Sequence, residues 1–123
     1  MGIIKWKRIY LDAEDGDGYR ILVDRLWPRG VKKEKAALDM WAKDITPSAD
    51  LRKAYHKGAI SFEDFSEAYR KELVNTPGFH EFVSLVAEKL SQGDVTLLYA
   101  SKEPQKSHIP VLREQLEEQL PAV

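Results

Sequence analysis

Cysteine is absent from the 123-residue sequence. Its absence excludes disulfide bonds, thiolate metal ligands and cysteine nucleophiles. The sequence also has no signal-peptide hydrophobic segment near its N-terminus, and no apolar run approaches the ~20 residues needed to cross a bilayer. These features fit a reducing compartment, and we predict a cytoplasmic protein with no membrane attachment.

An excess of charge of one sign is missing as well, because 19 Lys and Arg residues are balanced by 20 Asp and Glu residues. The overall charge therefore gives no reason to expect a nucleic-acid-binding protein. The His-Glu-x-x-His zinc motif, the phosphate-binding P-loop and the Gly-x-Ser-x-Gly nucleophile motif are also lacking. The sequence predicts no metal site and identifies no cofactor.

Hydrophobic residues make up 43% of the sequence, which suffices for one core, and the length predicts a single domain over residues 1–123. Apolar, β-branched and aromatic runs predict strands at 3–11, 19–26 and 95–100, with a shorter one within 38–45. The turn at 12–18 is short for a parallel crossover, so an antiparallel or direct connection is expected there. We predict an α/β fold with a small mixed, mostly parallel sheet of about four strands.

Five helices are predicted to flank this sheet. A short one lies within 32–37, and longer ones begin at Ser48, Ser61, Thr76 and Ser107, which are residues of types that cap helices. The apolar strand runs and the helical spacing of apolar residues also predict a set of core positions. These are Leu22, Phe82, Val86, Leu97 and Leu112.

The acidic turn at 12–18 resembles part of a calcium-binding loop. Counting from Asp15, however, Tyr19 and Arg20 occupy the fifth and sixth positions, where such a loop has an oxygen ligand and a glycine. We therefore expect a solvated turn that binds no calcium.

The first candidate site follows the strand that ends near Val23. Ligands of open α/β sheets bind at the carboxyl edge of the strands. Arg25 and Arg29 carry planar sets of N–H donors that suit phosphate or carboxylate, and Trp27 offers a flat apolar wall. The alternative is structural, with an Asp24–Arg pair and a tryptophan in the core.

The second candidate site follows the 95–100 strand and leads into the last helix. A helix N-terminus presents free N–H groups to an anion, and Lys102 and Ser107 would assist. Asp24 or His108 would act as the catalytic acid or base. The alternatives are a plain helix cap at Ser107 and a hydrogen-bonded structural histidine. The turn around Thr46–Ser48 is a further candidate for the same site.

A locally basic segment spans residues 25–35. It contains Arg25, Arg29, Lys32, Lys33 and Lys35, opposed only by Glu34. Such a segment attracts an anionic ligand or a nucleic-acid backbone. A solvated helix face explains its three lysines equally well.

Residues 19–30, Tyr-Arg-Ile-Leu-Val-Asp-Arg-Leu-Trp-Pro-Arg-Gly, resemble the signature of the YeaO-like branch of domain-of-unknown-function family 488. The resemblance covers nearly the whole chain, including Trp41, the 95–100 run and His108. It implies a compact α/β fold and transfers no catalytic residue. Mild departures from the family pattern fall at Asp44, within 101–103 and at Ser107.

Two functions remain open at this point. The first is binding of, or catalysis on, a small anionic and phosphate-bearing ligand, where the loops after Val23 and after Ala100 meet. The second is a non-enzymatic module that contacts a nucleic acid or an acidic protein through the basic segment 25–35. Oligomeric state is not predicted.

Overall fold

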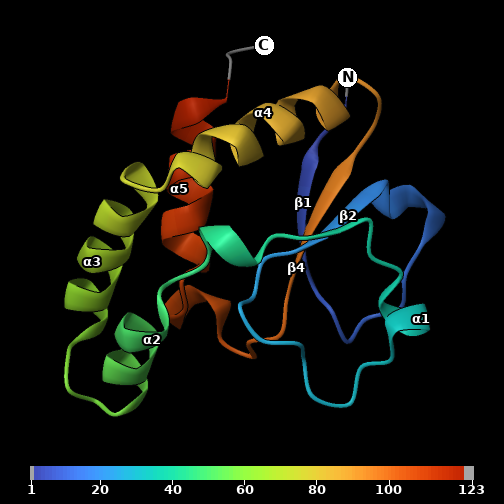
Figure 1. Cartoon of the computed structure of the whole chain (residues 1–123). Helices are drawn as coiled ribbons and strands as arrows, with labels where there is room; N and C mark the ends of the chain where they lie inside the picture. The colour runs from blue at the N-terminus through green and yellow to red at the C-terminus, as the bar shows by residue number, and fades with distance from the viewer. Residues whose placement is uncertain (1, 121–123) are drawn as a thin grey trace.

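Four strands form one sheet in the computed structural model, which describes residues 2–120 (Figure 1). The strands of the described range are β1 (Ile4–Arg8), β2 (Tyr19–Leu22), β3 (Met40–Trp41) and β4 (Val95–Tyr99). The α-helices are α1 (Lys33–Ala36), α2 (Ala49–His56), α3 (Phe62–Val74), α4 (Pro77–Leu90) and α5 (Ile109–Gln119). Short 3-10 turns occur at η1 (Asp15–Asp17), η2 (Lys43–Ile45) and η3 (Pro104–Lys106). The predicted α/β class is confirmed.

The strand order β1-β4-β2-β3 places β4 between the first two strands of the chain. Every pairing is parallel, so the sheet is not mixed and the expected antiparallel or direct connection from β1 to β2 is wrong. The segment 9–18 makes a parallel crossover without a long helix. It can do so because β1 and β2 have only five and four residues, while an extended chain covers about 3.3 Å per residue.

The larger hydrophobic core lies between one face of the sheet and helices α3, α4 and α5 (Figure 1). Alternate residues of a strand point to the same face, so Ile21 and Val23 share this face with Val95 and Leu97 of β4. The five predicted core positions are all buried, and this prediction is confirmed. None of the described helices is long and apolar enough to span a membrane.

The opposite face of the sheet is covered by loops and by α1 (Figure 1). Leu22 and Leu98 pack there against Ile9, Val31 and Ala36. The carboxyl half of this face is therefore apolar. Its amino half is polar, because strand residues such as Arg20 and Thr96 point in the same direction as Leu22 and Leu98.

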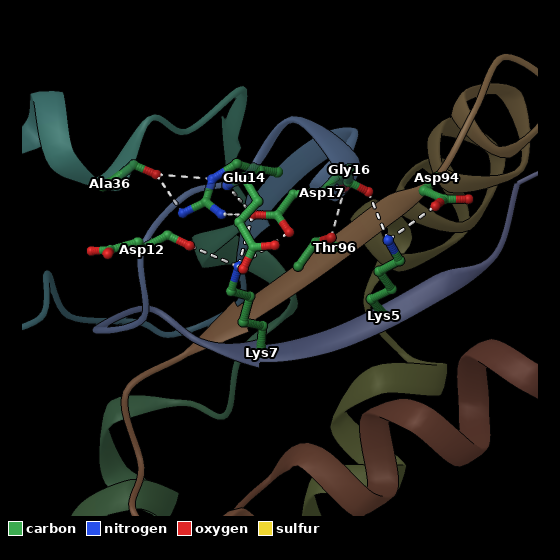
Figure 2. A network of polar contacts seen from close by, with 10 residues as sticks. Lys5, Lys7, Asp12, Glu14, Gly16, Asp17, Ala36, Asp94 and Thr96 are labelled. Atoms are coloured by element: carbon green, nitrogen blue, oxygen red, sulfur yellow. Dashed lines mark hydrogen bonds and ion pairs between the residues drawn. The ribbon is translucent and has the colours of Figure 1, made fainter.

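A buried ionic network, the Asp17 network, occupies that amino half (Figure 2). Asp17 is only 5% exposed, so the expectation of a solvated turn is wrong at this residue. Its carboxylate accepts hydrogen bonds from Lys7 Nζ at 3.1 and 3.2 Å and pairs with Arg20. Arg20 also donates from Nε and Nη2 to Ala36 O, and Thr96 Oγ1 donates to Asp17 O. The network ties the turn before β2 to the sheet and to α1.

Gly18 fixes the start of β2 beside β4. Its φ is 66°, and an added Cβ would lie 2.1 Å from Asp94 O. Glycine alone satisfies both conditions without strain. The close approach allows the N–H of Tyr19 to donate to Asp94 O at 2.9 Å.

The helix starts follow the predicted caps closely. Ser48 Oγ accepts a hydrogen bond from Leu51 N–H at 3.2 Å, and Ser61 Oγ accepts one from Asp64 N–H at 3.0 Å. Ser107 was expected to be the N-cap of the last helix, but the N-cap of α5 is His108, one residue later. Its Oγ nevertheless accepts a hydrogen bond from Ile109 N–H at 3.1 Å.

Candidate functional site

A cleft of about 360 Å³ opens at the carboxyl edge of β2 and β4. Three parts of the chain form it: the loop after β2, the loop from β4 to α5, and helices α2 and α3 with the turn before α2, which meet at the lower end of the sheet in Figure 1. We refer to it as the edge cleft. Its lining residues are Asp24, Arg25, Leu26, Trp27, Pro28, Pro47, Arg52, Tyr55, His56, Phe65, Ala100, Ser101, Lys106, Ser107 and His108.

Asp24 and His108 join the two loops at the base of the edge cleft. Asp24 Oδ2 accepts the N–H of Ala100 at 2.8 Å, and Asp24 Oδ1 lies 3.7 Å from His108 Nε2. His108 Nε2 is also 2.6 Å from Val23 O. A carbonyl oxygen can only accept, so Nε2 carries the proton, and Nδ1 of the neutral ring is an acceptor. The pair therefore fastens β2, β4 and α5 together.

Burial shifts the pKa values of both partners. It raises the pKa of Asp24, although the charge of His108 and the N–H of Ala100 work against that rise. Burial lowers the pKa of His108, opposed by Asp24 and by the Val23 carbonyl. Their side chains are 18% and 14% exposed. Both shifts favour the uncharged forms, as expected for groups removed from water.

Two predicted ligand-binding residues of the first loop reach the edge cleft. Arg25 lines it and is exposed, with one hydrogen bond from Nη1 to Pro47 O at 3.3 Å. Trp27 lines it with its indole fixed, because Nε1 donates to Val31 O at 2.7 Å and the ring lies edge-on to Trp41. Arg25 and His108 come from the two loops that were predicted to meet, and both line this cleft.

Arg29 and Lys102 do not line the edge cleft. Both side chains are exposed, and the carbonyl of Arg29 accepts a hydrogen bond from Tyr10 Oη at 3.0 Å. Asp24 is paired with His108 rather than with an arginine, which contradicts the alternative of a structural Asp24–Arg pair. The first loop turns outward after Pro28, which carries Arg29 away from the edge cleft.

Sequence reasoning missed the contribution of α2. Arg52, Tyr55 and His56 lie on one face of this helix and line the edge cleft. Arg52 Nε is buried and has no hydrogen-bond partner within residues 2–120. The spacing of these residues by three and four positions places them on one face of a helix. The sequence alone does not show which face of α2 the cleft meets.

The charge of the edge cleft is unbalanced. Arg25, Arg52 and Lys106 line it, whereas Asp24 is the one carboxylate among the lining residues. No ion pair joins either arginine to a carboxylate in the described part of the chain. A cleft with unpaired guanidinium groups and free N–H donors is suited to hold an anion. No cluster of three or more metal-ligating side chains occurs within residues 2–120.

The fold and the edge cleft describe a small parallel α/β domain with a candidate ligand site at the strand ends, and the sequence places it in a family. Residues 3–123 match the family model described as "Inactive DUF488-N3 subclade". The chain belongs to this family, and the resemblance to family 488 is confirmed.

The names of similar curated proteins state no activity. "Uncharacterized protein YeaO" of Escherichia coli (strain K12) is 46% identical over 113 residues, which cover 92% of this chain and 96% of that protein. "Uncharacterized protein Mb3100c" of Mycobacterium bovis and "Uncharacterized protein Rv3073c" of Mycobacterium tuberculosis are each 34% identical over 113 residues, with 92% of both chains covered. No solved structure shows a significant match.

Proposed function

We propose that the protein binds a small anionic ligand, such as a phosphate compound, in the edge cleft. Arg25, Arg52 and Lys106 would hold the anion, while Ser107 and Trp27 would border it. The observation that supports this most strongly is Arg52, whose buried Nε lacks a partner in the described chain. A buried donor without a partner loses about 1–3 kcal/mol of hydration that nothing in the protein replaces. An anion in the edge cleft would pair with the Arg52 guanidinium, which no ion pair engages within residues 2–120, and its charge would offset this cost.

His108 would add a hydrogen bond to the ligand, besides the charges of the three cations. Its Nε2 is engaged by Val23 O, so Nδ1 would accept a hydrogen bond from a ligand. Catalytic roles for Asp24 and His108 stay predictions. The description of the family as inactive favours binding over turnover. Incubation with p-nitrophenyl phosphate tests this, because we expect no hydrolysis above that of a His108→Ala variant.

Thermal unfolding in phosphate tests the binding proposal. Inorganic phosphate at ten times its Kd should stabilise the wild type by about 1.4 kcal/mol, and chloride at equal ionic strength should not. Arg52→Gln should lose this gain. Arg113→Gln should keep it, because Arg113 is exposed on α5 and outside the edge cleft. An absence of any phosphate effect in the wild type would contradict the proposal.

The basic segment 25–35 supports the second candidate function. All five of its Lys and Arg residues are exposed. Lys33 and Lys35 lie in α1, and Lys32 is its N-cap. They would contact a nucleic-acid backbone or an acidic protein without the edge cleft. A gel shift with duplex DNA that weakens steeply with salt, and is unchanged in Arg52→Gln, would favour this alternative. The cytoplasm remains the predicted compartment for either function.

A further inference from the structure

The aromatic side chains of the edge cleft bear on the kind of anion that fits there. Trp27, Tyr55 and Phe65 reach it from the loop after β2 and from helices α2 and α3. The polar atoms of the first two are already engaged by the backbone, since Trp27 Nε1 donates to Val31 O and Tyr55 Oη donates to Lys106 O, both at 2.7 Å. Phe65 is only 3% exposed and lies behind Tyr55 in the stack. A ligand can therefore touch the half-buried rings of Trp27 and Tyr55, which offer it no free hydrogen-bonding group.

The rings of α2 and α3 form a rigid stack. Tyr55 lies on Phe65 with centroids 4.4 Å apart and an angle of 19° between the ring planes. Phe65 continues to Tyr69, whose ring meets His108 edge-on at 5.8 Å. Aromatic pairs in this arrangement hold one another in place. The flat surface at the edge cleft is thus preformed.

A second, independent observation is an exposed aliphatic side chain in the same cleft. Leu26 is 59% exposed although it lines the edge cleft beside Pro28 and Pro47. An exposed leucine among cations and rings leaves apolar surface uncovered. Contact with an apolar part of a ligand would remove that surface from water.

We propose that the ligand of the edge cleft is an aromatic anion, that is, a planar ring carrying a phosphate or carboxylate group. The inference rests on the proposed function and specifies its ligand class. The anionic group pairs with Arg25, Arg52 and Lys106, and the ring lies against the aromatic side chains. A flat ring matches the planar ring of Tyr55, which Phe65 holds in place, better than a puckered one does, because stacking requires planar partners.

Isothermal titration with three phosphates tests the ligand class, at a pH high enough that each of them is a dianion. Phenyl phosphate should bind about tenfold more tightly than inorganic phosphate, the advantage that an added aromatic contact supplies. Cyclohexyl phosphate has similar bulk without a planar ring and should bind less tightly than phenyl phosphate. Equal Kd values for phenyl phosphate and inorganic phosphate, or for phenyl and cyclohexyl phosphate, overturn the aromatic assignment and leave the proposed function standing. Binding of none of the three overturns the proposed function itself.

Variants locate the ring contact. Tyr55→Leu should reduce the preference for phenyl phosphate severalfold while inorganic phosphate still binds, and Trp27→Leu should reduce the same preference. Tyr55→Phe keeps the ring and should retain the preference. Tyr10→Leu replaces an aromatic residue outside the edge cleft and serves as the matched control. Because Trp27 packs on Trp41, the Tyr55 variants decide the outcome if Trp27→Leu does not fold. An unchanged preference in Tyr55→Leu overturns the assignment.

Discussion

Two charged regions at opposite ends of the sheet differ in how completely their arginines are paired. In the Asp17 network, Arg20 pairs with Asp17 and donates twice to Ala36 O. In the edge cleft, Arg25 makes one 3.3 Å bond and Arg52 Nε makes none within residues 2–120. Buried charges that are fully paired belong to the structure, because an unpaired one is costly. The contrast indicates a structural role for the Asp17 network and supports the proposal of a ligand in the edge cleft.

The buried carboxylates of the two regions, Asp17 and Asp24, differ in the direction of their pKa shifts. Burial works to raise the pKa of Asp17, but the N–H of Glu14 and the charges of Lys7 and Arg20 hold it below its ordinary value of 3.8. Burial raises the pKa of Asp24, where fewer groups oppose it. Asp17 is therefore built to remain ionised. Asp24 is built to take up a proton more readily, as carboxylates in ligand sites often do.

Of the proposed substitutions, removing Arg20 should reduce the free energy of unfolding most. Arg20→Met leaves Asp17 buried with Lys7 as its one remaining cation, and we expect a loss of about 3–5 kcal/mol in the free energy of unfolding. Urea denaturation measures it. Arg113→Met is the control, because its pair with Glu117 is exposed and should contribute about 0–1 kcal/mol. A loss below about 1 kcal/mol in Arg20→Met would contradict the conclusion that the Asp17 network stabilises the fold.

The pH dependence of stability should separate the two carboxylates by sign. Asp17, with its lowered pKa, stabilises the fold above pH 3.8, and that contribution disappears as the pH falls through its pKa in the folded protein. Asp24, with its raised pKa, contributes below pH 3.8 and loses that contribution as the pH rises through its folded pKa. We expect the stability difference between wild type and Asp17→Asn to shrink from pH 6 to pH 3. The difference between wild type and Asp24→Asn should instead move in favour of the wild type over that range. If the stability difference from wild type changes with pH in the same direction for both variants, the proposed contrast between Asp17 and Asp24 is wrong.

The same comparison shows what the sequence predicts well. The apolar runs ending near Val23 and Ala100 give the ends of β2 and β4, because a buried parallel strand needs a continuous apolar segment. Ligand loops follow such ends, so the loops after Val23 and after Ala100 were predicted to meet, with Arg25 or Arg29 near His108. Arg25 and His108 do line one cleft, and Arg29 does not. The core positions followed from the same patterns.

The remaining features depend on contacts between distant segments. Asp17 meets Lys7 of β1 and Thr96 of β4 only because β4 lies between β1 and β2, an order that local patterns do not encode. Arg52 lies on a polar helix that would suit a solvent-exposed position equally well. Arg29 and Arg25 are indistinguishable in sequence, and the turn after Pro28 separates them. Tertiary arrangement, not local propensity, decides each of these.

Removing Arg52 should have a small effect on stability, opposite in kind to the loss of Arg20. Arg52→Gln removes a guanidinium that no carboxylate balances, so we expect the free energy of unfolding to stay within about 0.5 kcal/mol of wild type or to rise. Chemical denaturation without phosphate measures it. A loss above about 2 kcal/mol would mean that Arg52 has a structural role, and the main support for a ligand in the edge cleft would be removed.

Arg29→Ala should change least, and it discriminates between the two candidate functions. The side chain is exposed, and the hydrogen bond at this position uses the carbonyl of Arg29, which alanine retains. We expect stability within about 0.5 kcal/mol of wild type. Stabilisation by phosphate should also persist, because Arg29 does not line the edge cleft. If the basic segment 25–35 contacts a nucleic-acid backbone instead, Arg29→Ala should weaken DNA binding and reduce the slope of log K against log salt by about 1. Measuring both responses in one variant assigns the positive charge of the first loop either to the edge cleft, through Arg25, or to an exposed binding surface that includes Arg29.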